Sequence, residues 1–229
     1  MTETYNFFAP TKVLFGPGKL AELGGQALPG KKALVVTTGG KSVKANGYLA
    51  RVEEQLDRAG VGHVLFDRIE PNPLRDTVNA GGWMAREQGC DFVLALGGGS
   101  VMDGSKGICV VAANPGHDEA GNEVAGDIWD YVMGGTAKGL PIPNDPLPLV
   151  CVTTTAGTGS EVDAGACSPA RRGTRSCAWA APSCSRASPW WTPSSCSRFR
   201  PVSRRSRAST RCSTTWSATS RTTTRSWAT

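Results

Sequence analysis

The chain has 229 residues, a net charge of +6 and eight cysteines, which is long enough for one large domain or two small ones. These totals average two unlike parts, because residues 167–229 contain twelve arginines and fifteen serines but no lysine or acidic residue, which leaves −6 on residues 1–166. The first part has only three cysteines, which favours a reduced, cytoplasmic protein over a disulfide scaffold. Neither a signal peptide nor an apolar stretch of about 18 residues that could span a membrane is visible.

Short apolar runs alternate with helical patterns along residues 1–166. The expected strands are Val13–Phe15, Lys32–Thr38, His63–Phe66, Phe92–Leu96 and Leu147–Val152. The expected helices are Lys19–Ala27, Tyr48–Ala59, Arg75–Gly89 and Val101–Ala113. Asn114–Asp145 is a Gly/Pro-rich connection with a local turn at Ile128–Tyr131. This alternation predicts an α/β fold, a Rossmann-like parallel sheet with helices on both faces.

Three loops of small residues follow strands of this sheet, and ligands of such sheets bind beyond the carboxyl ends of the strands. We call them the lysine loop (Gly39–Ser42), the glycine turn (Gly97–Ser100) and the threonine loop (Thr153–Ser160). Each alone is equally compatible with an ordinary tight turn. Three on one edge favour a nucleotide site.

The glycine turn joins a strand to a helix N-terminus. Free N–H groups and the helix dipole favour a phosphate there, and Gly97, Gly98 and Gly99 let the backbone approach it. Ser100 adds a hydroxyl. Asp103, which we expect to cap the helix, can instead meet a ribose or an amide of the cofactor.

The other two loops indicate which nucleotide binds. Gly39, Gly40, Lys41 and Ser42 offer a cation and a hydroxyl where an NAD-binding fold usually has a carboxylate for the ribose 2′-OH, so NADP is preferred over NAD. Hydroxyls on the threonine loop suit ribose or adenine, or alternatively hydrogen bonds within the turn. They belong to Thr154, Thr155 and Thr158. Lys106 can reach a phosphate, although we expect it to face solvent.

Several of these motifs together resemble the iron-containing (group III) alcohol dehydrogenase family. The resemblance covers residues 5–166. It rests on the glycine turn with Asp103 and Lys106, the threonine loop followed by Glu161, the loop Glu70–Pro73, and the opening segment Lys12–Gly18. The stretch GGKSVKANG that starts at Gly39 is most similar to the NADP-dependent butanol dehydrogenase and aldehyde reductase branch.

The resemblance implies a dinucleotide-binding domain followed by an all-helical domain, and a homodimer in the intact family. It implies hydride transfer between NADP (or NAD) and a primary alcohol or aldehyde, and adds Asn72 to the cofactor-binding residues. It also implies Fe²⁺ or Zn²⁺, held by one Asp and three His of the helical domain, as a Lewis acid on the substrate oxygen.

Residues 167–229 end the resemblance. They lack Leu, Ile, Met and every acidic residue, and this composition predicts disorder. A family-like segment VVDPELMLSVPP, suitably coded and read one base later, gives WWTPSSCSRFRP, which is Trp190–Pro201. The metal-site motif FDALFHNMECYIS likewise gives STRCSTTWSATS, which is Ser209–Ser220. We therefore interpret the tail as a frameshifted continuation.

The frameshift has a direct consequence for function. Codons for the first metal-binding Asp and His would straddle two residues each, so neither ligand exists, and we name no metal ligand and no catalytic residue. We expect an inactive, truncated enzyme with a cofactor domain at 1–166 and a disordered tail at 167–229.

Two other functions stay open. A glycerol dehydrogenase or a dehydroquinate-synthase-like lyase uses the same scaffold, although the lysine and threonine loops favour the alcohol dehydrogenase. Arginine with interleaved tryptophan in the tail can bind single-stranded nucleic acid. An evolved tail would rarely lack all acidic residues together with Leu, Ile and Met, so we expect no nucleic-acid partner and no membrane partner.

Overall fold

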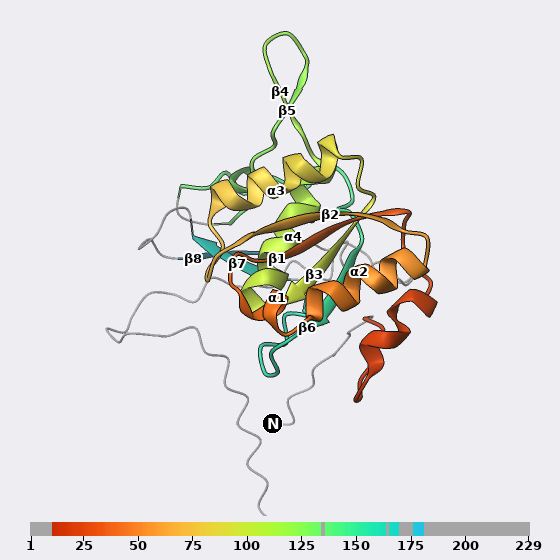
Figure 1. The fold of residues 1–229 in the computed structure, drawn as a ribbon. Helices are drawn as coiled ribbons and strands as arrows, with labels where there is room; N and C mark the ends of the chain where they lie inside the picture. Colours follow the sequence, from red (N-terminus) through yellow and green to blue (C-terminus); the bar gives the residue numbers. More distant parts are fainter. Residues whose placement is uncertain (1–10, 134–135, 164, 170–175, 181–229) are drawn as a thin grey trace, which may run out of the picture. The chain divides into compact units, whose positions relative to one another are not determined.

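The computed structural model describes residues 11–133, 136–163, 165–169 and 176–180. Their main feature is a four-stranded parallel sheet with the order β2-β1-β3-β6 (Figure 1). The strands are β1 (Lys32–Thr38), β2 (Gly62–Ile69), β3 (Phe92–Gly97) and β6 (Leu149–Thr153). The helices are α1 (Ser42–Ala45), α2 (Tyr48–Arg58), α3 (Arg75–Glu87) and α4 (Gly99–Ala113), with a 3₁₀ helix η1 (Lys19–Gly25). The predicted α/β fold is confirmed.

Side chains of β1 alternate between two buried faces of the sheet. Leu34 and Val36 face a core that includes residues of α3 and α4, whereas Ala33 and Val35 face a core with residues of α2 and η1. All four are fully buried. A strand covered on both faces is apolar throughout, which explains why β1 reads as a continuous apolar run in the sequence.

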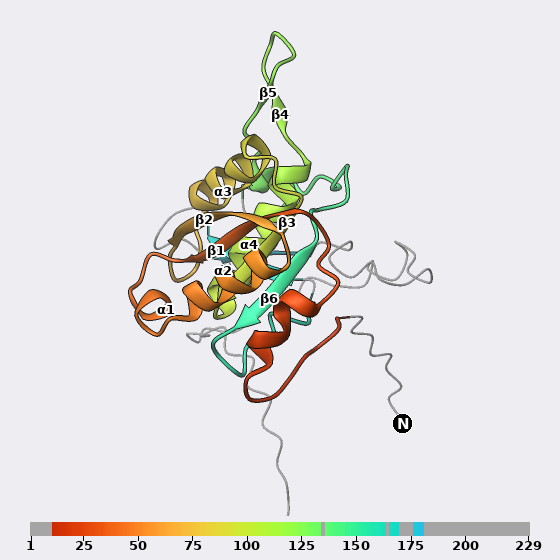
Figure 2. The same cartoon turned by 45° about the vertical axis from the view of Figure 1, so that its right-hand side comes forward.

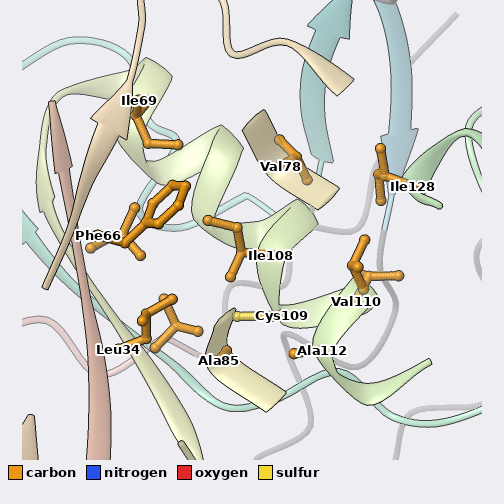
Figure 3. Close-up of a cluster of buried hydrophobic side chains, with 14 of the residues drawn as sticks. Leu34, Phe66, Ile69, Val78, Ala85, Ile108, Cys109, Val110, Ala112 and Ile128 are labelled. Atoms are coloured by element: carbon orange, nitrogen blue, oxygen red, sulfur yellow. The ribbon is translucent and has the colours of Figure 1, made fainter. Parts of the chain in front are cut away.

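Helices α3 and α4 lie unusually close together because glycines face the contact. A Cβ on Gly81 would lie 2.5 Å from Ile108 Cδ1, and one on Gly82 would lie 2.5 Å from Val111 Cβ. Figure 3 shows Ile108 among Phe66 and Val78 in the core that this packing forms. As a result α4 is buried over most of its length, and its N-terminus is fixed against the sheet.

The chain leaves the central strands in opposite directions. From β1 it crosses by α2 to β2, and from β3 it crosses by α4 to β6, which Figure 2 shows beside β3. The carboxyl ends of β1 and β3 therefore lie at a topological switch point, where open parallel sheets bind their ligands.

The long connection from α4 to β6 contains a short hairpin and one helical turn. These elements are β4 (Gly116–His117), β5 (Glu123–Val124) and η2 (Ile128–Asp130). Asp127 fixes the turn, because its carboxylate accepts hydrogen bonds from Arg75 Nε at 2.8 Å and from Trp129 N at 3.0 Å. The local turn predicted at Ile128–Tyr131 is confirmed.

One prediction near the start of the chain is wrong, and another is confirmed with a different type of helix. Val13–Phe15 forms no strand, since no described strand pairs with it, and Phe15 is 93% exposed. Without a partner strand, the backbone hydrogen bonds of an extended segment are left to water. The segment predicted as a helix at Lys19–Ala27 is the shorter 3₁₀ helix η1, which begins after Gly18 in the left-handed region (φ 76°).

The first residues of the tail also differ from the expected disorder. Strands β7 (Gly165–Pro169) and β8 (Ser176–Ala180) pair antiparallel, so described structure continues past the predicted boundary at residue 166. A two-stranded pair satisfies backbone groups between its own strands and does not need the alternating apolar pattern that the tail lacks. The remaining predictions for the tail lie outside the described residues.

Candidate functional site

The glycine turn places a helix N-terminus directly after a buried strand. Gly97 ends β3, and Gly98 precedes α4 in an extended conformation (φ −93°, ψ −168°) with no side-chain cap. Met102 N already donates to Gly98 O at 3.1 Å, so the helix begins at once. The first N–H groups of an α-helix have no partner inside the helix. Here they combine with the helix dipole to favour an anion beyond the end of β3.

The threonine loop starts from the neighbouring strand and is tied to the same point. Thr154 N donates to Gly97 O at 2.9 Å, which extends the pairing of β3 with β6 by one bond. Within the loop, Thr153 Oγ1 donates to Thr155 O at 2.9 Å. Thr158 Oγ1, which belongs to the hydroxyl set predicted for a ligand, accepts a hydrogen bond from Ser160 N at 3.3 Å, so part of that set also stabilises a turn, as the alternative interpretation expected.

The threonine loop then passes over the glycines. A Cβ on Gly98 would lie 3.0 Å from Thr155 Oγ1, and a Cβ on Gly99 would lie 3.0 Å from Thr158 Cγ2 and 3.3 Å from Ser160 Oγ. A side chain at either position would therefore crowd the threonine loop, and glycine lets the loop lie close to the start of α4. The two interpretations of the glycine turn, a tight turn and an anion site, are compatible.

Asn72 joins the site from a third element. It has a positive φ of 56°, which asparagine tolerates better than most residues, and its backbone N–H donates to Ser100 Oγ at 3.3 Å. The loop that contains it packs on α4, because a Cβ on Gly104 would lie 3.2 Å from Pro73 Cβ. The Ser100 hydroxyl accepts this bond and keeps its proton for a further partner.

The lysine loop lies at the same edge of the sheet. Thr37 Oγ1 donates to Leu96 O at 2.8 Å, which ties the carboxyl end of β1 to that of β3. Gly39, Gly40, Lys41 and Ser42 follow and are all exposed. Lys41 directly precedes α1. All three loops predicted from the sequence thus follow adjacent strands of one sheet at the predicted edge.

Asp67 is a residue that the sequence pattern missed. It lies in β2, which extends beyond the predicted His63–Phe66, and its carbonyl would be 3.2 Å from a Cβ on Gly39. Lys44 Nζ contacts its carboxylate at 2.5 Å, and this hydrogen bond lowers the pKa of Asp67. A carboxylate therefore does lie beside the lysine loop, paired with a lysine. The irregular pairing between β1 and β2 after Val36 brings it there.

Two predictions about α4 need correction. Asp103 does not cap the helix, because the helix already begins at Gly99 and leaves Asp103 in its second turn. Lys106 does not face solvent: it is only 1% exposed. Its Nζ lies 3.8 Å from Asp103 Oδ1, so the two side chains form an ion pair. The apolar side chains around α4 bury the lysine stem and leave its ammonium only internal acceptors.

The lysine loop and Thr153–Thr158 of the threonine loop are exposed at this edge of the sheet. Two hollows among the described residues, of about 440 and 420 Å³, are both lined by Arg86 and Glu123 and contain none of the predicted site residues. Among the described residues, no three His, Cys, Asp or Glu side chains lie close enough to hold a metal ion. These residues therefore do not fit an iron or zinc site. No helix in the described ranges is long and apolar enough to cross a membrane.

Comparison with known families gives one extended match. Residues 10–179 match the family model described as iron-containing alcohol dehydrogenase. The matched range starts and ends later than the 5–166 on which the sequence resemblance rests, and it includes most of the β7–β8 pair.

Individual relatives have the same first part and extend much further. The chain is 39% identical over 163 residues to a probable NADH-dependent butanol dehydrogenase of Bacillus subtilis and 38% identical over 162 residues to an NADPH-dependent aldehyde reductase of Escherichia coli. Each match covers 71% of this chain and 38% of the relative. The chain thus spans about two fifths of the length of these curated relatives.

Solved structures give the same result for the fold. An alcohol dehydrogenase from a halo-thermophilic archaeon of a Red Sea brine pool matches with a TM-score of 0.65 and 36% identity, over 74% of this chain and 41% of the other. The butanol dehydrogenase A of Thermotoga maritima, which is NADH-dependent, matches with a TM-score of 0.66 and 28% identity, over 78% of this chain and 41% of the other.

Proposed function

Because the chain belongs to the iron-containing alcohol dehydrogenase family, whose members use NAD(H) or NADP(H), we propose that its three loops bind a nicotinamide dinucleotide. The observation that carries this proposal is the N-terminus of α4, which has no side-chain cap and lies at the switch point of the sheet. The threonine loop packs directly beside it, so a ligand there would contact both the loop and the helix N-terminus.

Each loop has a role in this proposal. Backbone N–H groups at Gly98–Ser100 donate to the pyrophosphate, and the free proton of Ser100 adds a further donor. Exposed hydroxyls of Thr154, Thr155 and Thr158 hydrogen-bond the ribose or the adenine. Asn72 lies next to Ser100 and contacts the nicotinamide end.

We propose NADP(H) as the preferred form. Lys41 and Ser42 are exposed at the carboxyl end of β1, where the ribose 2′-phosphate would lie, and Lys44 neutralises Asp67 nearby. A lysine and a hydroxyl favour a phosphate, whereas a free carboxylate would favour the ribose 2′-OH of NAD. One similar protein is named NADH-dependent and another NADPH-dependent, so membership of the family does not decide between the two nucleotides. The choice of NADP(H) is supported by the charges beside the lysine loop.

Nucleotide binding is tested directly by titrating the purified 229-residue chain with NADPH and with NADH while following nicotinamide fluorescence. We expect saturable binding of both, tighter for NADPH, and competition by inorganic pyrophosphate. Absence of saturable binding for both nucleotides would refute the proposal. Tighter binding of NADH would refute only the NADP preference.

The reaction proposed for an intact relative of this chain is hydride transfer between NAD(P)(H) and a primary alcohol or aldehyde, with the metal as Lewis acid. This chain would hold the cofactor but not complete that reaction. The described residues provide no metal site, and with suitably chosen codons the tail can be read as a shifted frame where the first two ligands are expected. We propose that the chain is an inactive cofactor-binding form. Its cytoplasmic location and the homodimer of the intact family stay predictions.

Two experiments test inactivity and its cause. With Fe²⁺ or Zn²⁺ supplied, the purified chain should show no NADPH-dependent reduction of aldehydes, and measurable turnover would contradict the proposal. The family match reaches residue 179 and the first decoded segment starts at Trp190, so the change of frame is sought in the codons for residues 164–190. Adding or removing one base there should restore DALFH downstream. If neither frame does so, the frameshift is wrong.

A further inference from the structure

Lys106 is a buried charge without a function in the proposed site. Its side chain comes from the second turn of α4 and is 1% exposed. Taking an ammonium out of water is costly unless internal oxygen atoms replace the lost hydration. The oxygen atoms that contact a lysine at this depth must therefore offset the cost of burying its charge.

The contacts of Lys106 lead to the end of the threonine loop. Its Nζ donates to Gly165 O at 2.6 Å and to Asp163 Oδ1 at 3.3 Å. Asp103 Oδ1, on the same helix, lies 3.8 Å from Nζ and forms an ion pair with it. Asp163 in turn accepts a hydrogen bond from Gly165 N. The lysine thus joins α4 to the chain segment just after the threonine loop.

The threonine loop is consequently fixed at both of its ends to the same unit of structure, β3 and α4. At its start, Thr154 N donates to Gly97 O at 2.9 Å, at the end of β3. At its far end, Lys106 holds Gly165 O and Asp163 from α4. Between these two points the loop passes over Gly98 and Gly99 at van der Waals distance.

We propose that Lys106 is a positioning residue for the nucleotide site: it fixes the threonine loop against the N-terminus of α4 without touching the cofactor. The expected effect on nucleotide affinity rests on the proposed function. The fixing of the loop by Lys106 does not. The expected ligand group is the pyrophosphate or an adjoining ribose, held between the glycine turn and the loop.

The first variant is Lys106→Met, which keeps the length of the buried stem and removes the charge and all donors. We expect amide hydrogen exchange of residues 154–163 to become faster, while exchange in β1 and β3 is unchanged. We expect the dissociation constant for NADPH to rise about tenfold, the effect of losing a hydrogen bond to a charged group. Lys106→Arg, which keeps donors and charge, should recover part of both effects.

The matched control is Lys138→Met, which removes an exposed lysine that pairs with Asp130 at 2.6 Å. It should change neither loop exchange nor NADPH binding. If Lys106→Met does not fold, Asp163→Asn takes its place. Asp163 is 59% exposed, so this variant should fold, and it should speed exchange in the loop by a smaller factor.

The outcomes separate this inference from the proposed function. Unchanged loop exchange in Lys106→Met, or in Asp163→Asn where that variant replaces it, refutes the positioning role. Weaker NADPH binding without faster loop exchange also refutes it, because the lysine would then act on the nucleotide directly. Uniformly faster exchange through the whole sheet would show a purely structural role. If the wild-type chain binds no nucleotide, the proposed function fails, and loop exchange alone still decides the role of Lys106.

Discussion

The lysine loop and the threonine loop follow strands of the same sheet but are held in different ways. The threonine loop is hydrogen-bonded to Gly97, lies against Gly98 and Gly99, and is followed by the contacts of the buried Lys106. Thr153–Thr158 and the whole lysine loop are exposed, but the threonine loop ends at the buried Ser160, whereas the charges beside the lysine loop, Lys44 and Asp67, are partly exposed.

This difference indicates a division of roles. In the proposed site, the loop that is packed against the helix N-terminus would fix the shape of the part that binds the pyrophosphate, which NADH and NADPH share. An exposed loop can change its charges without disturbing the core, so it is suited to distinguish the two nucleotides by the 2′-phosphate. Substitutions around the threonine loop should change the affinities for NADH and NADPH equally. Substitutions in the lysine loop should change the ratio of the two affinities.

The largest effect is expected from Gly98→Val. The new side chain would crowd Thr155, because even a Cβ would lie 3.0 Å from Thr155 Oγ1, and it would lie beside the N–H groups that are proposed to bind the phosphate. We expect binding of both NADPH and NADH to weaken by about a hundredfold or more, the loss of two charge-assisted hydrogen bonds. Fluorescence titration of both nucleotides measures it.

The control for this prediction is Gly25→Val, at the end of η1, where a Cβ would have no neighbour within 4 Å. It should bind both nucleotides like the wild type, and circular dichroism should show that both variants are folded. Unaltered nucleotide binding by a folded Gly98→Val protein would place the phosphate elsewhere. Loss of NADPH binding alone would remove the proposed division between the two loops.

A smaller and selective effect is expected from Lys41→Ala. Loss of one charged donor should weaken the binding of NADPH by about tenfold and change the binding of NADH by no more than about twofold, because only NADPH carries the 2′-phosphate. Lys31→Ala is the matched control, since Lys31 precedes β1 at the opposite end of the strand. Equal losses for both nucleotides in Lys41→Ala would show that Lys41 contacts the shared pyrophosphate instead.

The sheet and its loops could be predicted from the sequence because local patterns determine them. The apolar run of β1 reflects burial on two faces, and Gly97–Gly99 mark a backbone that must approach another chain segment closely. The site edge followed from topology alone, since parallel strands end at one edge of the sheet.

The errors share a different cause: they concern contacts between distant segments. Lys106 reads as a surface lysine until Asp163 and Gly165 are brought beside it. Val13–Phe15 has strand-like residues but no partner strand. Asp67 was missed because the predicted strand stopped at Phe66, and only the irregular pairing of β2 with β1 brings its residue next to Gly39. No periodicity along the chain reports such contacts.

The smallest effect, and the one that tests the charge balance at the lysine loop, is expected from Asp67→Asn. The substitution removes the carboxylate and frees Lys44, so the ratio of NADPH to NADH affinity should rise about threefold at low salt and less at 1 M salt. The hydrogen bond from Lys44 lowers the pKa of Asp67, so the wild-type carboxylate stays ionised until the pH falls below its usual range. Any stability that the pair provides is therefore present above that range and lost as the pH falls through the lowered pKa. Between pH 7 and 8, where the 2′-phosphate with its second pKa of about 6 is also almost fully ionised, the difference between variant and wild type should thus be nearly constant. A difference that changes within that interval, or none at low salt, would show that another group sets the preference at the lysine loop.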